Sequence, residues 1–271
     1  MRLSIDHRTR YHFSEPQNRV VQLARMTPLD HANQTVIRWQ ISVDRDVRLR
    51  EARDGYGNAT TMLYVDGPLE ALEIAVHGEV LTGPGDGLVS GAVETLPPLF
   101  FLRSTQLTTI TQPIQAFADH VCGNLKDPAN RAQMLNVALF ERVKLKQGRS
   151  PKTRTAGETL AAGSGNVRDR TQLLVAAARA AGLPARFVSG HSLDGHKIVG
   201  QKSTHCWAEI HIDGRGWMGF DPAIGRPPGE MHVRVAIGLD AREATPLSGT
   251  RMGGGIEVLD VDVQIESRGE Q

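Results

Sequence analysis

The chain has 271 residues, of which 40% are hydrophobic, and it carries 31 lysines and arginines against 30 aspartates and glutamates. The resulting net charge of +1 excludes the concentrated basic surface that a general nucleic-acid or anionic-membrane binder needs. Apolar residues along the whole chain exclude a mostly disordered protein. The length fits one large domain or two small ones.

The sequence contains no run of about 18 apolar residues and no secretory leader pattern. We therefore expect a cytoplasmic protein with no membrane or nucleic-acid partner. The two cysteines, Cys122 and Cys206, are too few for a disulfide framework and form no CxxC pair. His191 and His196 share a glycine-containing segment, but no third ligand follows them at a recognised spacing. We expect no metal and no cofactor.

The first 83 residues predict a β-rich region. Residues 36–43 and 61–65 are short runs with many β-branched side chains, and a turn cluster at residues 54–58 separates them. This pattern favours an antiparallel β-sandwich. Residues 83–98 are rich in glycine and proline and predict a connection. We therefore divide the chain into a β-rich region, residues 1–100, and a second region, residues 101–271.

The second region predicts an α+β fold. Residues 113–121, preceded by Thr111 as N-cap, and residues 134–140 have apolar side chains three to four positions apart, as amphipathic helices do. Strand patterns follow further along the chain, at residues 185–189, 204–212, 217–221 and 256–265. The last of these segments largely alternates in polarity, and we expect it to return to the N-terminal sheet.

A third helix is predicted to begin at residue 167. Asn166 is a favourable N-cap, and Asp169 lies in the first turn, near the positive end of the helix dipole. Gly182 stands where the residue after a helix often adopts a positive φ, and Pro184 prevents continuation.

His205 and Asp221 form a candidate catalytic pair. Strand alternation places His205, Trp207 and Glu209 on one face of their strand. If residues 211–215 connect this strand to the next, His205 lies directly opposite Asp221 in an antiparallel ladder. A carboxylate in that place would orient the imidazole as a general base. The alternative interpretation is two structural polar residues at strand ends.

Four short motifs follow one another in the second region, at residues 163–169 (GSGNVRD), 182–190 (GLPARFVSG), 205–209 (HCWAE) and 216–222 (GWMGFDP). Their order and spacing resemble the bacterial transglutaminase-like superfamily. The β-rich residues before Gly83 are similar to the region that precedes the core in bacterial members. The resemblance implies a papain-like fold with a Cys–His–Asp triad, in which His205 is the base and Asp221 the acid that orients it.

The resemblance places the nucleophilic cysteine at Val167, where this chain departs from the family. A thiol at a helix start has a lowered pKa, because the unpaired N–H groups and the dipole stabilise an anion, but valine offers no nucleophile. Removing a triad nucleophile costs about 10⁶-fold in turnover in a serine protease, so we expect acyl transfer to be lost. We predict an inactive transglutaminase-like, cysteine peptidase-like protein that binds a peptide or protein ligand in the cleft, or pairs with an active relative.

Two alternatives stay open. The first is an active hydrolase or acyltransferase on peptide or amide substrates, in which His205 and Asp221 work with Ser164, with Cys206 or with an activated water. Cys206 is expected to point into the core from the opposite face of its strand, and the surroundings of Ser164 do not match a G-x-S-x-G nucleophile elbow. The second is a purely structural interaction protein in which His205 and Asp221 are remnants.

Trp207, Asp169 and Arg168 are the candidate ligand-binding residues. The family that the chain resembles walls its substrate groove with aromatic residues, although Trp207 and Trp217 also fit core packing over the hairpin. Asp169 also fits the role of a carboxylate at a helix start. Arg168 and Arg170 flank it, and they either line the groove and favour an anionic ligand or face solvent.

Overall fold

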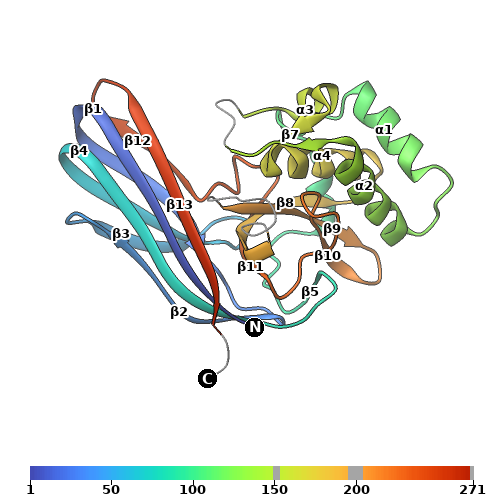
Figure 1. Cartoon of the computed structure of the whole chain (residues 1–271), viewed down its shortest axis with the longest axis horizontal. Coiled ribbons are helices and arrows are strands. Elements are labelled where there is room, and N and C mark those ends of the chain that lie inside the picture. Colours follow the sequence, from blue (N-terminus) through green and yellow to red (C-terminus); the bar gives the residue numbers. More distant parts are fainter. Residues whose placement is uncertain (149–152, 195–203, 269–271) are drawn as a thin grey trace.

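Two antiparallel sheets and four α-helices form most of the part of the chain that the computed structural model describes, residues 1–148, 153–194 and 204–268 (Figure 1). The N-terminal sheet consists of β1 (Arg2–Thr27), β2 (Gln34–Val43), β3 (Arg48–Arg53), β4 (Ala59–Thr82), β12 (Leu247–Met252) and β13 (Glu257–Arg268). The core sheet consists of β5 (Leu88–Val89), β8 (Ala185–Ser192), β9 (His205–Ile212), β10 (Gly216–Phe220) and β11 (His232–Gly238).

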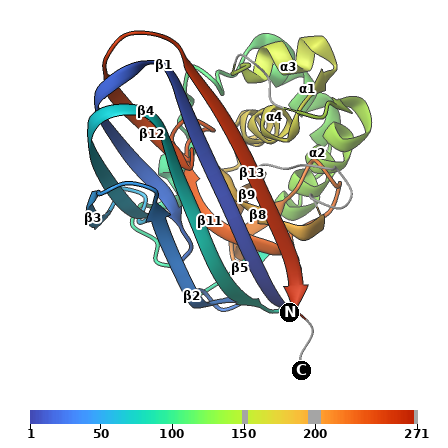
Figure 2. The ribbon, with the colours of Figure 1, turned by 60° about the vertical axis from the view of Figure 1, so that its left-hand side comes forward.

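The N-terminal sheet is built around two long strands, β1 and β4, which pair with each other antiparallel. β13 and β12 pair with successive stretches of β1, while β2 and β3 do the same along β4, and Figure 2 shows β13, β1 and β4 running side by side. Alternate side chains of β1 are buried, as a sheet with one covered face requires. The return of the C-terminal strand to this sheet, expected from its alternation, is confirmed by the pairing of β13 with β1.

The core sheet has the strand order β11-β8-β9-β10-β5. Its β11 edge packs against the N-terminal sheet through a cluster of buried aliphatic side chains that includes Leu3 of β1, Val80 of β4 and Val235 of β11. Burial of apolar area at this contact supplies the main force that joins the two sheets.

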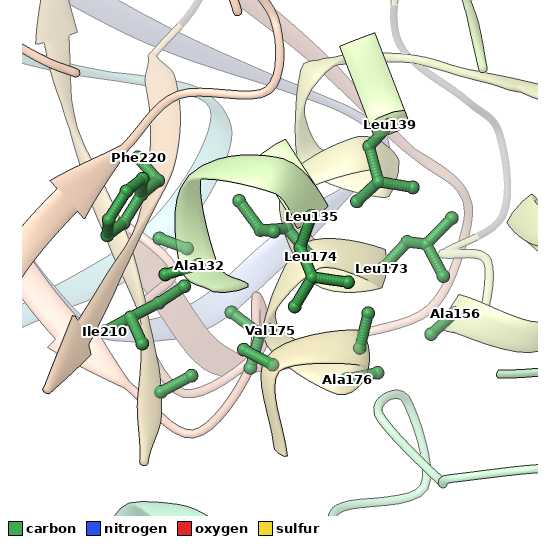
Figure 3. Packing of buried hydrophobic residues seen from close by; sticks show 14 of the residues in the cluster. Ala132, Leu135, Leu139, Ala156, Leu173, Leu174, Val175, Ala176, Ile210 and Phe220 are labelled. Carbon is green, nitrogen blue, oxygen red and sulfur yellow. The ribbon is translucent and has the colours of Figure 1, made fainter. Parts of the chain in front are cut away.

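The helices pack against the core sheet at strands β8, β9 and β10. They are α1 (Gln112–Cys122), α2 (Pro128–Arg142), α3 (Ala156–Ala162) and α4 (Val167–Ala180), and a short 3₁₀ helix, η1 (Pro98–Leu102), precedes them. α4 is central: every side chain from Thr171 to Ala178 is buried. Its alanines allow close approach of neighbouring elements, and its leucines pack among side chains of α2 and the core sheet (Figure 3), namely Leu135, Leu139, Ile210 and Phe220.

Both ends of α4 have the predicted capping. The Asn166 side chain accepts a hydrogen bond from the Asp169 N–H at 2.9 Å, and the Asp169 carboxylate accepts one from the Asn166 N–H at 3.2 Å, which together form a capping box. At the other end Gly182 adopts a φ of 74°, a conformation that glycine tolerates best. The sequence therefore fixes where the first turn of α4 lies.

The expected α+β fold with a mostly-sheet N-terminal region is confirmed. α3, η1 and β5 were not predicted, because each is short and carries little periodic signal. Thr111 does stand at the N-cap of α1, but its side chain makes no capping hydrogen bond. The domain boundary at residue 100 stays a prediction. None of the helices in the described residues has the length and apolar character needed to cross a membrane, and the cytoplasmic location stays a prediction.

Candidate active site

Strand β9 sends alternate side chains into two different environments. Cys206 and Ala208 join the large cluster formed with α4, whereas Trp207 joins a separate cluster that includes Trp217. The His205 ring lies near that of Trp207, with centroids 6.3 Å apart. The strand therefore separates the histidine from the cysteine that follows it, as the alternation predicts.

The hairpin between β9 and β10 brings His205 and Asp221 together, although not in the predicted register. Gly216 pairs with Ile212, so the connection is residues 213–215 and not the five residues expected. Because the ladder moves by two positions, the parity is kept and the two side chains remain on one face. His205 Nε2 lies 2.6 Å from Asp221 Oδ2, a short hydrogen bond between two buried groups.

Asp221 is held by more than His205. Its Oδ1 accepts a hydrogen bond from the Ala223 N–H at 2.8 Å, and its Oδ2 lies 3.3 Å from Nε2 of His232. Burial alone would raise the pKa of Asp221, but the neighbouring imidazoles, first His205 and then His232, hold it well below its usual range. Asp221 is thus a fixed carboxylate that orients two histidines.

His232 is the site residue that the sequence analysis missed. It lies on β11, and it reaches Asp221 only because β11 pairs with β8, which in turn pairs with β9. Its Nε2 also lies 3.1 Å from the Ser192 hydroxyl. A lone histidine at a strand start carries no local signal of such a contact, so only the strand order could have pointed to it.

His205, Asp221 and His232 also deserve consideration as metal ligands, because their candidate ligand atoms all lie within 4.8 Å of one another. The hydrogen bonds favour a proton network instead. His232 Nδ1 accepts the Gly229 N–H at 3.3 Å, so the neutral ring carries its proton on Nε2, toward Asp221. A metal-bound histidine uses its second nitrogen as a donor. The expected absence of metal stays a prediction, and His196 lies outside the described residues.

A cavity of about 610 Å³ lies between the two sheets at the start of α4. Its lining includes Val167 and Arg168 of α4, Cys206 of β9, and His7 and Thr9 of β1. Val167 is the first residue of α4 and is only 3% exposed. The capping box therefore places a hydrocarbon side chain on the cavity wall at the point where the helix N–H groups begin.

The three predicted ligand-binding residues occupy different places. Arg168 lines the cavity, whereas Trp207 lies on the opposite face of β9, edge-on to His232 with ring centroids 5.4 Å apart. Asp169 is not among the lining residues. It caps α4, and its Oδ1 is buried without a hydrogen-bond partner among the described residues. Arg170, which follows it, is buried and donates to the carbonyls of Leu139 and Phe140.

The two alternative nucleophiles also differ in their surroundings. Cys206 lines the cavity, but burial raises the pKa of its thiol to about 12, with the charge of Arg168 opposing this shift and the smaller effects of Asp221 and Asp169 adding to it. Ser164 is buried in β7 (Ser164–Gly165), its hydroxyl donates to the Ala162 carbonyl at 3.4 Å, and it does not line the cavity. Neither group is activated where it lies.

The fold and the buried histidine–carboxylate pair define a transglutaminase-like, cysteine peptidase-like architecture. Residues 3–81 match the model of the bacterial transglutaminase-like N-terminal region, and residues 115–222 match that of the transglutaminase-like superfamily. The chain therefore contains a bacterial transglutaminase-like N-terminal domain followed by a transglutaminase-like core. The second match spans Val167, His205 and Asp221.

Similar proteins occur in mycobacteria. The uncharacterised protein ML0607 of Mycobacterium leprae is 25% identical over 280 residues, covering 97% of this chain and 98% of its own length. Rv2569c of Mycobacterium tuberculosis, also uncharacterised, is 24% identical and covers 92% of this chain and 87% of its own. Among solved structures, a candidate cysteine protease from Cytophaga hutchinsonii superposes with a TM-score of 0.80 at 18% identity, over 100% of this chain and 92% of that protein. This likeness shows the fold.

Proposed function

We propose that the protein is a catalytically inactive transglutaminase-like protein that acts by binding a ligand in the cavity at the start of α4. One observation carries the proposal: Val167, the first residue of α4, lies on the cavity wall. The resemblance to the family assigns the nucleophilic cysteine to this residue. The helix start would stabilise a thiolate, but a valine side chain can neither attack an acyl group nor accept a proton.

The retained groups support this interpretation. His205 and Asp221 keep the hydrogen bond of a triad base and its orienting carboxylate, although neither is among the described residues that line the cavity. A cavity of about 610 Å³ lies within the usual volume range of small-molecule sites, about 300 to 1,000 Å³. The protein therefore retains the means to bind while it lacks the attacking atom.

The alternative is an active enzyme that uses Cys206, which lines the same cavity as Val167. Its pKa near 12 argues against this role, since only a minute fraction of the thiol is ionised at pH 7. Ser164 donates its hydroxyl to a backbone carbonyl and has no contact with the cavity. Both are therefore weaker candidates than a binding function.

The test is acyl transfer from a glutamine peptide to a primary amine, followed by ammonia release and by mass spectrometry of the protein. We expect no turnover and no covalent adduct with the wild-type chain. Val167→Cys should create a thiol with a pKa well below the ordinary value of about 8.5, because it stands at a helix start. The pH dependence of iodoacetamide alkylation measures this pKa. Met134→Cys, an exposed position within α2, is the matched control and should titrate near 8.5.

Turnover by the wild-type chain would defeat the proposal, and three variants would then identify the nucleophile. Loss of activity in Cys206→Ala or in Ser164→Ala assigns the attack to that side chain. A reaction that survives both substitutions and disappears in His205→Ala assigns it to a water activated by the imidazole. An ordinary thiol pKa in Val167→Cys would mean that the electrostatics of the helix start do not favour an anion in the cavity.

A further inference from the structure

The cavity at the start of α4 is built from both halves of the fold. β1 contributes His7 and Thr9, and β12 and β13 contribute Leu247, Leu259 and Val261. These residues face the start of α4 and the Cys206 side of β9 across the cavity. The N-terminal sheet therefore forms a wall of the site and shapes what can enter it.

The charged side chains in the described lining of this cavity have one sign. Among the described residues that line it, Arg168 and Lys146 are basic and none is acidic. Arg168 makes no hydrogen bond or ion pair within the described part of the chain, and its Nε is buried without a partner. A guanidinium nitrogen removed from water and left unpaired is costly, and a bound anion would satisfy it.

Burial raises the pKa of Asp169 and the charge of Arg168 acts to lower it, so Asp169 offsets part of this charge, although no hydrogen bond joins the two side chains. Asp169 is turned toward Gly165, whose Cα lies so close that an added Cβ would be 2.7 Å from the Asp169 Cβ. Asp221 is held between His205 and His232. The N–H groups of the first turn of α4 add positive potential on the same side as Arg168.

Part of the cavity lining is apolar. Leu247, Leu259 and Val261 come from the N-terminal sheet, and Phe187 of β8 comes from the core sheet. Burial lowers the pKa of His7 to about 4, so this lining histidine is neutral at pH 7 and adds no charge. The cavity thus has two cationic side chains, and the rest of its described lining is uncharged, with apolar residues beside polar ones such as Thr9 and Ser189.

We propose that this cavity binds a small amphipathic carboxylate, with its carboxylate at Arg168 and the start of α4 and its apolar part against Leu247, Leu259 and Val261. The inference rests on the proposed binding function and names the chemical class of its ligand. A guanidinium and a carboxylate form two parallel hydrogen bonds, which explains why a single arginine can select the charged end. The apolar wall selects a ligand with a hydrocarbon part.

The test compares three probes that share one alkyl chain: octanoate, octanamide and octylammonium. Titration calorimetry on the full chain at pH 7 measures the dissociation constant of each. We expect octanoate to bind at least ten-fold more tightly than octanamide, and octylammonium to bind most weakly of the three. Raising the salt concentration should weaken octanoate binding more than octanamide binding, since only the first depends on charge.

Variants locate the site. Arg168→Gln should weaken octanoate binding at least ten-fold and leave octanamide binding within two-fold. Lys146→Gln should weaken octanoate binding only about three-fold, because this side chain is exposed and water screens it. Val261→Phe, which fills the apolar end from a half-buried position, should weaken octanoate and octanamide alike. Arg215→Gln, in the exposed β9–β10 turn, is the charge-matched control and should change neither.

The outcomes separate this inference from the proposed function. Octanamide or octylammonium binding as tightly as octanoate overturns the assignment of a carboxylate but leaves a binding protein. Unchanged octanoate affinity in Arg168→Gln, or no binding of any probe, likewise overturns it. Covalent turnover in the acyl-transfer assay overturns the proposed function independently of these affinities.

Discussion

The two faces of β9 differ in whether their charged side chains are paired. On the Trp207 face, the fully buried Glu209 is bonded to Arg186 and Arg234, both at 2.7 Å, and Asp221 is bonded to His205. On the Cys206 face, Arg168 lines a cavity that has no acidic residue in its described lining. On the Trp207 face each of these charged groups has a hydrogen-bonded partner of opposite charge or a polar partner. On the Cys206 face, Arg168 has no such partner among the described residues.

The difference distinguishes structural charges from charges available to a ligand. Burial alone would raise the pKa of Glu209, but the charges of Arg234 and Arg186 outweigh it and lower the pKa to about 2. Such a group is part of the packing, since removing either partner leaves a buried charge unpaired. Arg168 has no partner to lose among the described residues, so its substitution should affect binding more than folding.

The largest effect on stability is expected from breaking the ion pairs of Glu209 with Arg186 and Arg234. Glu209→Gln leaves Arg186 and Arg234 without their shared carboxylate and should lower the free energy of unfolding by about 3 to 5 kcal/mol. Urea denaturation followed by circular dichroism measures the loss. The control is Glu94→Gln, which removes the 35%-exposed partner of Arg186 and should cost about 1 kcal/mol or less. Equal losses in the two variants would contradict the comparison.

The next effect concerns His7, on the cavity wall. Its pKa is about 4 in the folded chain against an ordinary 6.5. Between these two pH values the imidazole is therefore mostly protonated in the unfolded chain and mostly neutral in the folded chain. The contribution of His7 to stability is therefore complete above pH 6.5 and is lost as the pH falls toward 4, by about 3 kcal/mol.

Denaturation at several pH values tests the role of His7. His7→Gln should flatten the dependence of the unfolding free energy between pH 7 and 4. His12→Gln, at an exposed position of the same strand, should leave the slope of the wild-type chain. An unchanged slope in His7→Gln would show that this imidazole accepts its proton in the folded state.

A smaller effect on stability is expected from removing the N-cap of α4, the helix whose first residue, Val167, lines the cavity. Asn166→Ala removes the capping bond to the Asp169 N–H and should cost about 1 kcal/mol of stability. Thr111→Ala removes the N-cap side chain of α1, which makes no such bond, and should cost less. Thermal unfolding of both variants gives the difference. A greater loss in Thr111→Ala would contradict the assignment of the cap.

The smallest effect on stability should come from substitution of Arg168. Arg168→Gln is expected to change the free energy of unfolding by no more than about 0.5 kcal/mol, because no described residue pairs with it. The same denaturation measurement checks this value beside Glu209→Gln. A loss of several kcal/mol would place Arg168 among the structural charges.

The sequence determined much of this molecule, because several of its signals are local. Alternation predicted β9, β10 and β13, and the Asn166–Asp169 pair predicted where α4 begins. Motif order led to the transglutaminase-like core and to the pairing of His205 with Asp221. These features depend on residues near one another or on a spacing that the chain itself records.

Only the tertiary structure decided which charged side chains have hydrogen-bonded partners and which line the cavity without one. Arg168 and Arg170 lie two positions apart on one helix, where successive residues turn by about 100°, so one reaches the cavity and the other is buried beneath α2 carbonyls. His232 joins Asp221 through the order of strands in the core sheet, and β1 adds His7 and Thr9 to the cavity lining, more than 150 positions before Val167. Such contacts arise from packing between distant segments, and no local pattern encodes them.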